Sequence, residues 1–215
     1  MNQILTTKNT EDLNASFKLN RAKSKSIFLR YQLILSTLFL YFFVVYYFNT
    51  TYIMHEEEKK SQQLLKAYNI TKLYSSINIP EKYIPSPNDS LIIGMIEIKK
   101  LNIVYPILSD STDDFLKISP CRFFGPNANE FGNLCIAGHN YDNDRFFSKI
   151  NTLKNNDIIL IYDNTGSVLK YKVFSVYETT NDDNECTRQI ENIKEITLVT
   201  CNNMNGNRII VKAKV

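Results

Sequence analysis

Three residues in the C-terminal part of the chain could together catalyse acyl transfer. Cys201 ends the segment Ile196-Thr-Leu-Val-Thr-Cys201. Arg208 begins the next segment in which apolar residues recur at every second position. His139 follows an apolar run, and it is one of two histidines in the chain. A thiol attacks a carbonyl carbon only as the thiolate, so it needs a base or a positive neighbour. The chain therefore offers a nucleophile, a base and a fixed cation.

The alternation of side chains predicts that these three residues share one surface. Successive side chains of a strand point to opposite faces. In the segments that contain Cys201 and Arg208, one face carries the inward apolar set. Both candidate residues fall on the other face, Cys201 together with Thr197 and Val199. The same alternation, applied to the apolar run before His139, predicts that the histidine side chain also points outward. The residues expected to point inward are Leu134, Ile136, Ile196, Leu198, Ile209, Val211, Ala213 and Val215.

From residue 91 onward the pattern is mostly that of β-strands. Many short apolar runs separated by turn residues predict a barrel or a sandwich. One short helix is expected to begin within 111–114 and to carry Phe115, Leu116 and Ile118. A second is expected from Asp144 through Leu153, where Asp144 would be the N-cap. The predicted strands are 91–98, 103–107, 131–138, 158–162, 168–177, 195–200 and 208–215.

An uncharged apolar segment, residues 31–54, precedes this region. It is long enough to cross a bilayer, which takes about 20 apolar residues. Basic residues precede it and Glu56–Glu58 follow it, so the positive-inside bias predicts a cytoplasmic arm at 1–30 and an extracellular remainder. A cleavable signal peptide is the alternative, but its apolar region would be shorter and an A-x-A site would follow.

The remaining organisation follows from this topology. We expect residues 55–87 to form an extracellular tether, because prolines interrupt its second half, and residues 88–215 to form the folded domain. The net charge of +3 arises from the N-terminal arm. No run of basic residues is interleaved with aromatic residues, so nucleic-acid binding is not expected.

The four cysteines, Cys121, Cys135, Cys186 and Cys201, all lie outside the membrane in this topology. An even count in an extracellular protein allows a disulfide, and Cys121–Cys135 is the candidate pair. Against that pairing, Cys135 lies in an apolar run and has the character of a small buried hydrophobe. Cys201 must stay free if it is the nucleophile.

The T-L-x-T-C segment with a downstream arginine, the Gly-His after an apolar strand and the N-terminal anchor resemble the sortases of Gram-positive bacteria. The resemblance covers about residues 88–215. It implies a closed eight-stranded β-barrel with short helical connections, anchored by the transmembrane helix in the cell membrane. It also implies a cysteine transpeptidase that cleaves an LPxTG-like signal of surface proteins and transfers the acyl group, through a thioester, to an amine of a peptidoglycan precursor or a pilin.

The resemblance also implies roles for individual residues. Cys201 would be the nucleophile, His139 the acid and base, and Arg208 the stabiliser of the oxyanion or thiolate. Thr200 and Asn140 would contribute to substrate binding. No lid with an aromatic Asp-Pro motif precedes the barrel and no second hydrophobic helix follows it, which favours the class A, D or E type over a pilus-polymerising class C enzyme.

No cofactor is expected, although the carboxylates of Glu130, Asp182 and Asp183 could bind calcium, because hard cations prefer oxygen ligands. Two other functional classes stay open. A cysteine peptidase that acts only as a hydrolase would use the same cysteine and histidine. A catalytically silent β-barrel binding module on a membrane tether would need neither Cys201 nor Arg208.

Overall fold

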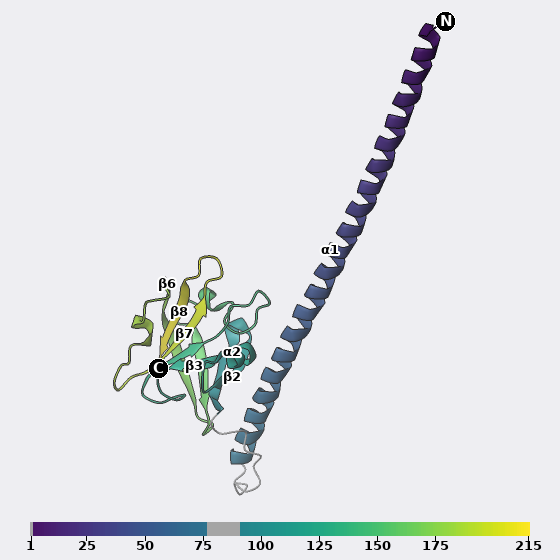
Figure 1. Cartoon of the computed structure of the whole chain (residues 1–215). Helices are drawn as coiled ribbons and strands as arrows, with labels where there is room; N and C mark the ends of the chain where they lie inside the picture. The colour runs from purple at the N-terminus through teal and green to yellow at the C-terminus, as the bar shows by residue number, and fades with distance from the viewer. Residues whose placement is uncertain (1, 77–90) are drawn as a thin grey trace. The chain divides into compact units, whose positions relative to one another are not determined.

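The computed structural model describes residues 2–76 and 91–215, and the strands of its C-terminal part close into an eight-stranded barrel (Figure 1). The order around the barrel is β1-β2-β3-β4-β7-β8-β6-β5. The expected fold class is therefore confirmed. The strands are β1 (Ile92–Ile98), β2 (Ile103–Leu108), β3 (Cys121–Phe124), β4 (Gly132–Ala137), β5 (Ile158–Asp163), β6 (Val168–Thr179), β7 (Lys194–Cys201) and β8 (Arg208–Lys214).

The N-terminal part is one long helix, α1 (Asn2–Ser76). The chain divides into two compact units, Met1–His55 and Glu56–Val215. Within α1, the stretch Ile27–Asn69 is long and apolar enough to be a candidate membrane span. The boundary expected at residue 88 and the proline-rich part of the expected tether lie outside the described residues.

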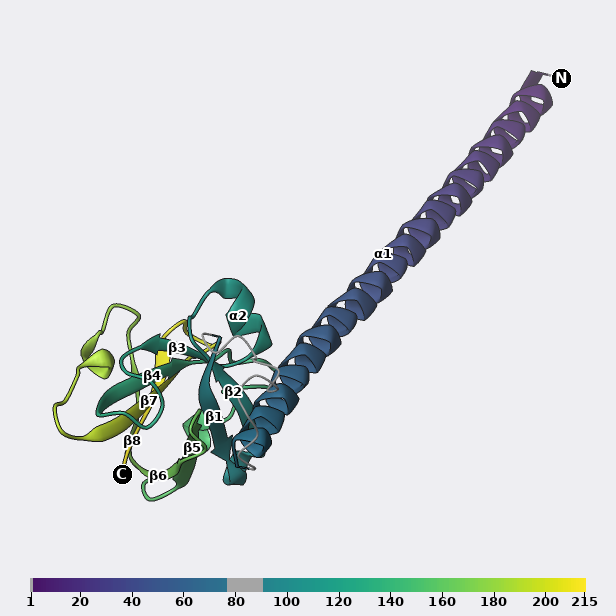
Figure 2. The same ribbon diagram turned by 90° about the horizontal axis from the view of Figure 1, so that it is seen from below.

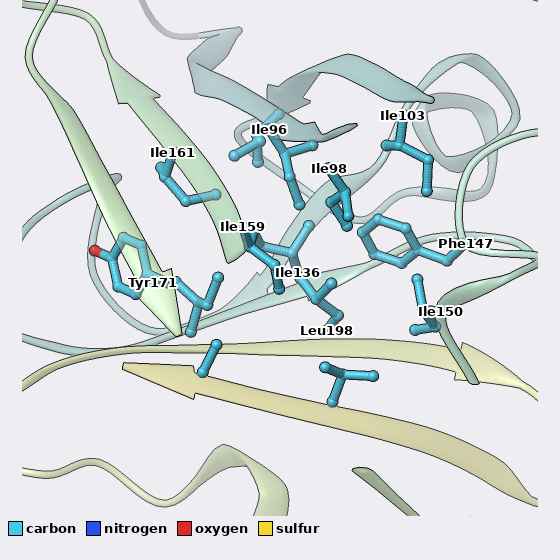
Figure 3. Packing of buried hydrophobic residues seen from close by; sticks show 14 of the residues in the cluster. Ile96, Ile98, Ile103, Ile136, Phe147, Ile150, Ile159, Ile161, Tyr171 and Leu198 are labelled. Atoms are coloured by element: carbon cyan, nitrogen blue, oxygen red, sulfur yellow. The ribbon is translucent and has the colours of Figure 1, made fainter. Parts of the chain in front are cut away.

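The barrel interior is filled by the inward side chains of the strands (Figure 3). β-Branched residues dominate it, because they suit the pleated surface of a sheet and lose little freedom there. The residues that the alternation placed inward belong to this core, so the predicted register is confirmed for them. Val215 is the exception: it follows the end of β8 and is exposed, so its predicted inward position was wrong. Fully buried members include Ile96, Ile136, Ile161, Leu198 and Phe147.

The segment of α1 that begins at Glu56 is packed against the barrel. Leu64, Leu65 and Tyr68 contact a second apolar cluster that contains Met95 of β1 and Leu108 of β2. The Tyr68 hydroxyl donates a 2.7 Å hydrogen bond to the backbone carbonyl of Asp163. The first part of the region 55–87, expected as a tether, is therefore a structural part of the barrel unit.

Two local predictions were wrong. The short strand β3 was missed, because its four residues lie between Pro120 and Gly125 and show no alternation. No α-helix runs from Asp144 through Leu153. The segment contains only the 3-10 turn η3 (Ile150–Thr152), and Asp144 has a left-handed φ of 65°. Phe146, Phe147 and Ile150 have the sequence spacing of an amphipathic helix. They are all buried, but the segment that carries them is irregular.

The short helix predicted to begin within residues 111–114 is confirmed as α2 (Asp113–Ile118). The Thr112 hydroxyl caps it by accepting a 3.3 Å hydrogen bond from the backbone N–H of Phe115. The strands nearest the candidate residues are β4, β7 and β8: β4 and β7 are parallel neighbours, and β7 and β8 are antiparallel (Figure 2). This arrangement brings the C-terminal ends of β4 and β7 to the same edge of the barrel.

Candidate active site

Cys201 is the last residue of β7, and its side chain is exposed. Ile196 and Leu198 of the same strand lie in the barrel core. Because the cysteine has the opposite parity to these residues, its thiol lies on the outer side of the wall. The strand thus anchors the backbone of Cys201 in the sheet while it leaves the sulfur accessible.

Arg208 is the first residue of β8 and pairs directly with Cys201 across the β7–β8 ladder. Side chains of directly opposite residues in an antiparallel pair start about 5 Å apart and point to the same face. The guanidinium therefore emerges beside the thiol. Only the loop 202–207 separates the two residues in sequence, so the hairpin sets this pairing.

The loop 202–207 is held by one carboxylate that the sequence analysis did not single out. Glu178 of β6 accepts hydrogen bonds from the side-chain amides of Asn202 at 2.9 Å, Asn205 at 2.6 Å and Asn207 at 2.8 Å. These bonds lower the pKa of Glu178, because they favour its charged form. The run of asparagines in this loop was the available signal, since each amide needs an acceptor.

His139 follows β4, and the parallel pairing of β4 with β7 places it near Cys201. Ala137 pairs with Val199, and the Gly138 N–H donates a 3.0 Å hydrogen bond to the Val199 carbonyl. The Thr200 hydroxyl donates to the Gly138 carbonyl at 2.7 Å. Thr200 is almost fully buried, so it joins the histidine segment to the cysteine strand from inside the wall.

Asn140 also joins these two segments. Its side-chain amide donates a 2.8 Å hydrogen bond to the Cys201 carbonyl, and its own carbonyl accepts one from the Asn203 side chain, also at 2.8 Å. A residue next to the histidine thus fixes the backbone of the cysteine. The expected substrate contacts of Asn140 and Thr200 stay predictions, while both residues hold the site together.

The structure brings Cys201, His139 and Arg208 to one cavity of about 230 Å³. Two larger cavities in the described residues, of about 380 and 370 Å³, contain neither Cys201 nor His139. The smaller cavity is the candidate site because a thiol, an imidazole and a guanidinium meet there beside apolar side chains. Its lining consists of Ser111, Leu116, Phe123, Ala137, Gly138, His139, Val199, Thr200, Cys201 and Arg208.

The surroundings of His139 favour its neutral form. Burial lowers the pKa of the imidazole, and the positive charges of Arg145 and Lys117 act in the same direction. The negative charges of Glu57 and Asp113 oppose the shift without cancelling it. A neutral imidazole at pH 7 can accept a proton from the Cys201 thiol, which makes the histidine a suitable general base.

Comparison with known proteins gives the family. Residues 96–215, more than half of the chain, match the model of the sortase domain. The chain belongs to the sortase family. It is 33% identical over 117 residues to Sortase A of Bacillus anthracis, a match that covers 54% of this chain and 55% of that protein. This sortase therefore spans about half the length of that curated relative.

Solved structures of sortases have the same fold. A Sortase D5 transpeptidase of Clostridium perfringens is 28% identical, with a TM-score of 0.58 over 74% of this chain and 96% of the other. Sortase A of Corynebacterium diphtheriae is 20% identical, with a TM-score of 0.53 over 77% and 91% of the two chains, and it supports the fold alone. Sortases as a family are cysteine transpeptidases.

The other three cysteines of this sortase are unsuited to nucleophilic attack. Cys121, Cys135 and Cys186 are free and buried. Burial raises the pKa of Cys121 and of Cys135 to about 12 and also raises that of Cys186, so their thiols stay protonated. The considered Cys121–Cys135 disulfide is absent: Cys121 pairs with Ala137 across β3 and β4, while Cys135 occupies a different register position.

The carboxylates considered for calcium are engaged within their own loops. Glu130 accepts hydrogen bonds from the backbone and side-chain nitrogens of Asn127 at 3.0 and 3.3 Å. Asp183 accepts from the Thr179 hydroxyl at 2.5 Å and from the Glu185 N–H at 2.9 Å. Among the residues whose side chains the structure describes, no group of three or more His, Cys, Asp or Glu could hold a metal ion.

Gly138 leaves no room for a side chain in front of His139. A Cβ atom at this position would lie 2.7 Å from Cδ2 and 2.9 Å from Cγ of the buried Phe147 ring. We expect Gly138→Ala to destabilise the protein by about 1–3 kcal/mol, as overpacking of a core does, and to displace His139. Urea unfolding and peptide cleavage would measure both effects. Wild-type stability would show that the Phe147 ring moves aside freely.

Proposed function

We propose that this sortase is a membrane-anchored cysteine transpeptidase that cleaves an LPxTG-like sorting signal and transfers the acyl fragment to an amine. The observation that carries the proposal is the meeting of Cys201, His139 and Arg208 at one cavity of a sortase barrel. The acceptor would be an amino group of a peptidoglycan precursor or of a pilin subunit. The enzyme would be of the class A, D or E type.

The proposed reaction begins with proton transfer from the Cys201 thiol to the neutral imidazole of His139. The thiolate attacks the carbonyl carbon of the scissile bond, and the negative charge that develops on the carbonyl oxygen is stabilised by Arg208. His139 then protonates the leaving amine, which leaves a thioester on Cys201. In the second half, His139 takes a proton from the incoming amine, which attacks the thioester and restores the thiol.

The proposed location is the cell membrane, with residues 31–54 as the single span. The candidate membrane helix of the structure supports this assignment. The large apolar side chains of this stretch, such as Leu35, Phe39 and Phe43, are exposed, as those of a lipid-facing helix would be. Basic residues before the span and acidic residues after it favour a cytoplasmic N-terminus and an extracellular catalytic domain.

Peptide cleavage tests the proposal most directly. The full chain in detergent is incubated with a library of sorting-signal peptides, with and without an amine acceptor, and the products are identified by mass spectrometry. We expect cleavage after the threonine of an LPxTG-like sequence, and a peptide–amine product when the acceptor is present. Cleavage with water as the only acceptor would favour the hydrolase alternative, and no cleavage of any peptide would favour the silent binding module.

Arg208→Lys tests whether the guanidinium, rather than a positive charge alone, is needed. The guanidinium presents several donors in one plane, while an ammonium is a compact and strongly hydrated point charge. Loss of one oxyanion donor costs about 10²–10³ in kcat in other enzymes, and we expect a loss of that order here with little change in stability. Lys212→Arg, on the same face of β8, is the control. Full turnover of Arg208→Lys would mean that Arg208 is only a surface charge.

A further inference from the structure

Arg145 is a buried cation that connects three segments next to the active-site cavity. The residue is only 7% exposed. Its Nε donates to Glu58 at 2.9 Å, its Nη1 to Glu57 at 3.2 Å and its Nη2 to the backbone carbonyl of Lys117 at 3.2 Å. The two carboxylates belong to α1 and the carbonyl belongs to α2. A single guanidinium therefore holds both helices against the segment that follows His139.

The same guanidinium contacts the aromatic rings behind His139. Its central carbon lies 4.6 Å from the ring centroid of Phe146 and 5.2 Å from that of Tyr141, both within the range of a cation–π interaction. The Tyr141 ring lies 5.1 Å from the imidazole of His139, centroid to centroid, at an interplanar angle of 46°. A continuous series of contacts thus leads from Glu57 and Glu58, through Arg145 and Tyr141, to the imidazole.

These contacts constrain one another. A buried charge is stable only while its partners are present, and loss of one partner of such a pair is strongly destabilising at that site. The planar fork of the guanidinium satisfies two carboxylates and one carbonyl in a single orientation, which a flexible ammonium could not reproduce. The Tyr105 hydroxyl donates to Glu58 at 3.3 Å, so the carboxylate is itself held from the barrel side.

We propose that Arg145, Glu57 and Glu58 form a positioning network that holds Tyr141 and His139 in the orientation needed at the cavity. The proposal rests on the role of His139 in the proposed function. It makes the helical segment that begins at Glu56 a part of the active site. The network also holds the apolar wall of the cavity, because Lys117 follows Leu116, which lines it.

The first test is kinetic and uses the full chain in detergent with the double substitution Glu57→Gln, Glu58→Gln. Both side chains keep their shape and lose the charge that holds Arg145. We expect kcat to fall by roughly ten- to a hundredfold, as displacement of a catalytic group by about 1 Å can do, while KM changes less than about twofold. The control is Glu56→Gln, because Glu56 pairs with Lys59 at 3.6 Å and carries the same charge.

The second test follows His139 directly and does not depend on turnover. The chain has two histidines, so a His55→Gln background leaves His139 as the one imidazole signal in an NMR titration. Glu57 and Asp113 raise the pKa of His139, while Arg145 and Lys117 lower it; Cys201 and Arg208 face it across the cavity. Removal of the Glu57 charge should therefore move the midpoint to lower pH, and the Glu56→Gln control should leave it unchanged.

The outcomes separate the network from a purely structural role. An unchanged kcat together with an unchanged midpoint in the double variant would overturn the proposal. An equal loss of kcat in the Glu56→Gln control would also overturn it. If the double variant unfolds at the assay temperature, Glu57→Gln alone, with a circular dichroism melt, supplies the same two readouts. If the wild-type chain cleaves no peptide, the proposed function fails, but the titration still decides whether the network acts on His139.

Discussion

Cys201→Ala is expected to abolish cleavage and transfer of a sorting peptide while the barrel stays folded. Without the thiol no thioester can form, and removal of the nucleophile of a covalent enzyme can cost about 10⁶ in kcat. The thiol is exposed at the end of β7, so its loss removes little packing, and we expect a change in the free energy of unfolding within about 0.5 kcal/mol. Product formation and urea unfolding measure the two effects.

Alkylation provides a control for the Cys201→Ala prediction. In the wild-type chain we expect iodoacetamide to modify Cys201 first, because the other three cysteines are buried and their pKa values are raised. In the Cys201→Ala chain this rapid modification should disappear. Turnover of Cys201→Ala close to that of the wild type would contradict the assignment of the nucleophile, as would rapid alkylation at Cys121, Cys135 or Cys186.

His139→Ala is expected to be the next most severe change. A positioned general acid and base contributes about 10²–10⁴ to the rate, and we expect a loss of that order in kcat. Added imidazole should restore part of the activity, because it can enter the space that the side chain leaves. His55→Ala is the matched control, since it removes the other histidine, which is exposed in α1. Equal activity of the two variants would contradict the role of His139.

The pH dependence gives a second measurement for His139. Burial holds the pKa of this imidazole below its ordinary value, so it is neutral at pH 7 and becomes protonated only at lower pH. A protonated imidazole cannot accept the thiol proton, so kcat/KM should fall as the pH drops through this pKa. In His139→Ala the acidic limb should disappear from the residual activity. An unchanged acidic limb would assign it to another group.

The candidate residues could be selected from the sequence, and so could the pairing of Cys201 with Arg208, because that pairing depends only on neighbouring parts of the chain. Cys201 and Arg208 flank one short loop, so the period of two along each strand was enough to place both on the outer face of a hairpin. The candidate membrane span and its orientation could also be predicted, because they depend only on the composition of the apolar segment and on the charges beside it. The barrel core could be predicted from the same alternation, because the apolar residues at every second position of a strand identify the face that points inward.

Residues that meet across long separations could not be placed in this way. The distance of His139 from Cys201 depends on the parallel pairing of β4 with β7, which no local pattern records. The segment from Asp144 to Leu153 has helical apolar spacing, but its side chains are buried by the barrel without a helix. In that case tertiary packing, rather than backbone periodicity, produced the pattern.

The sequence by itself was enough to select Cys201, His139 and Arg208 as candidates and to predict the strand register, because both depend on residue type and on alternation along single strands. The tertiary structure alone decided what surrounds the histidine. The sequence analysis did not single out Arg145, and it used Glu57 and Glu58 only as acidic residues that follow the apolar span. Only the packing of the helical segment that begins at Glu56 against the barrel brings these two partly buried carboxylates onto the buried guanidinium of Arg145, which forms the ion-pair network next to the segment of His139.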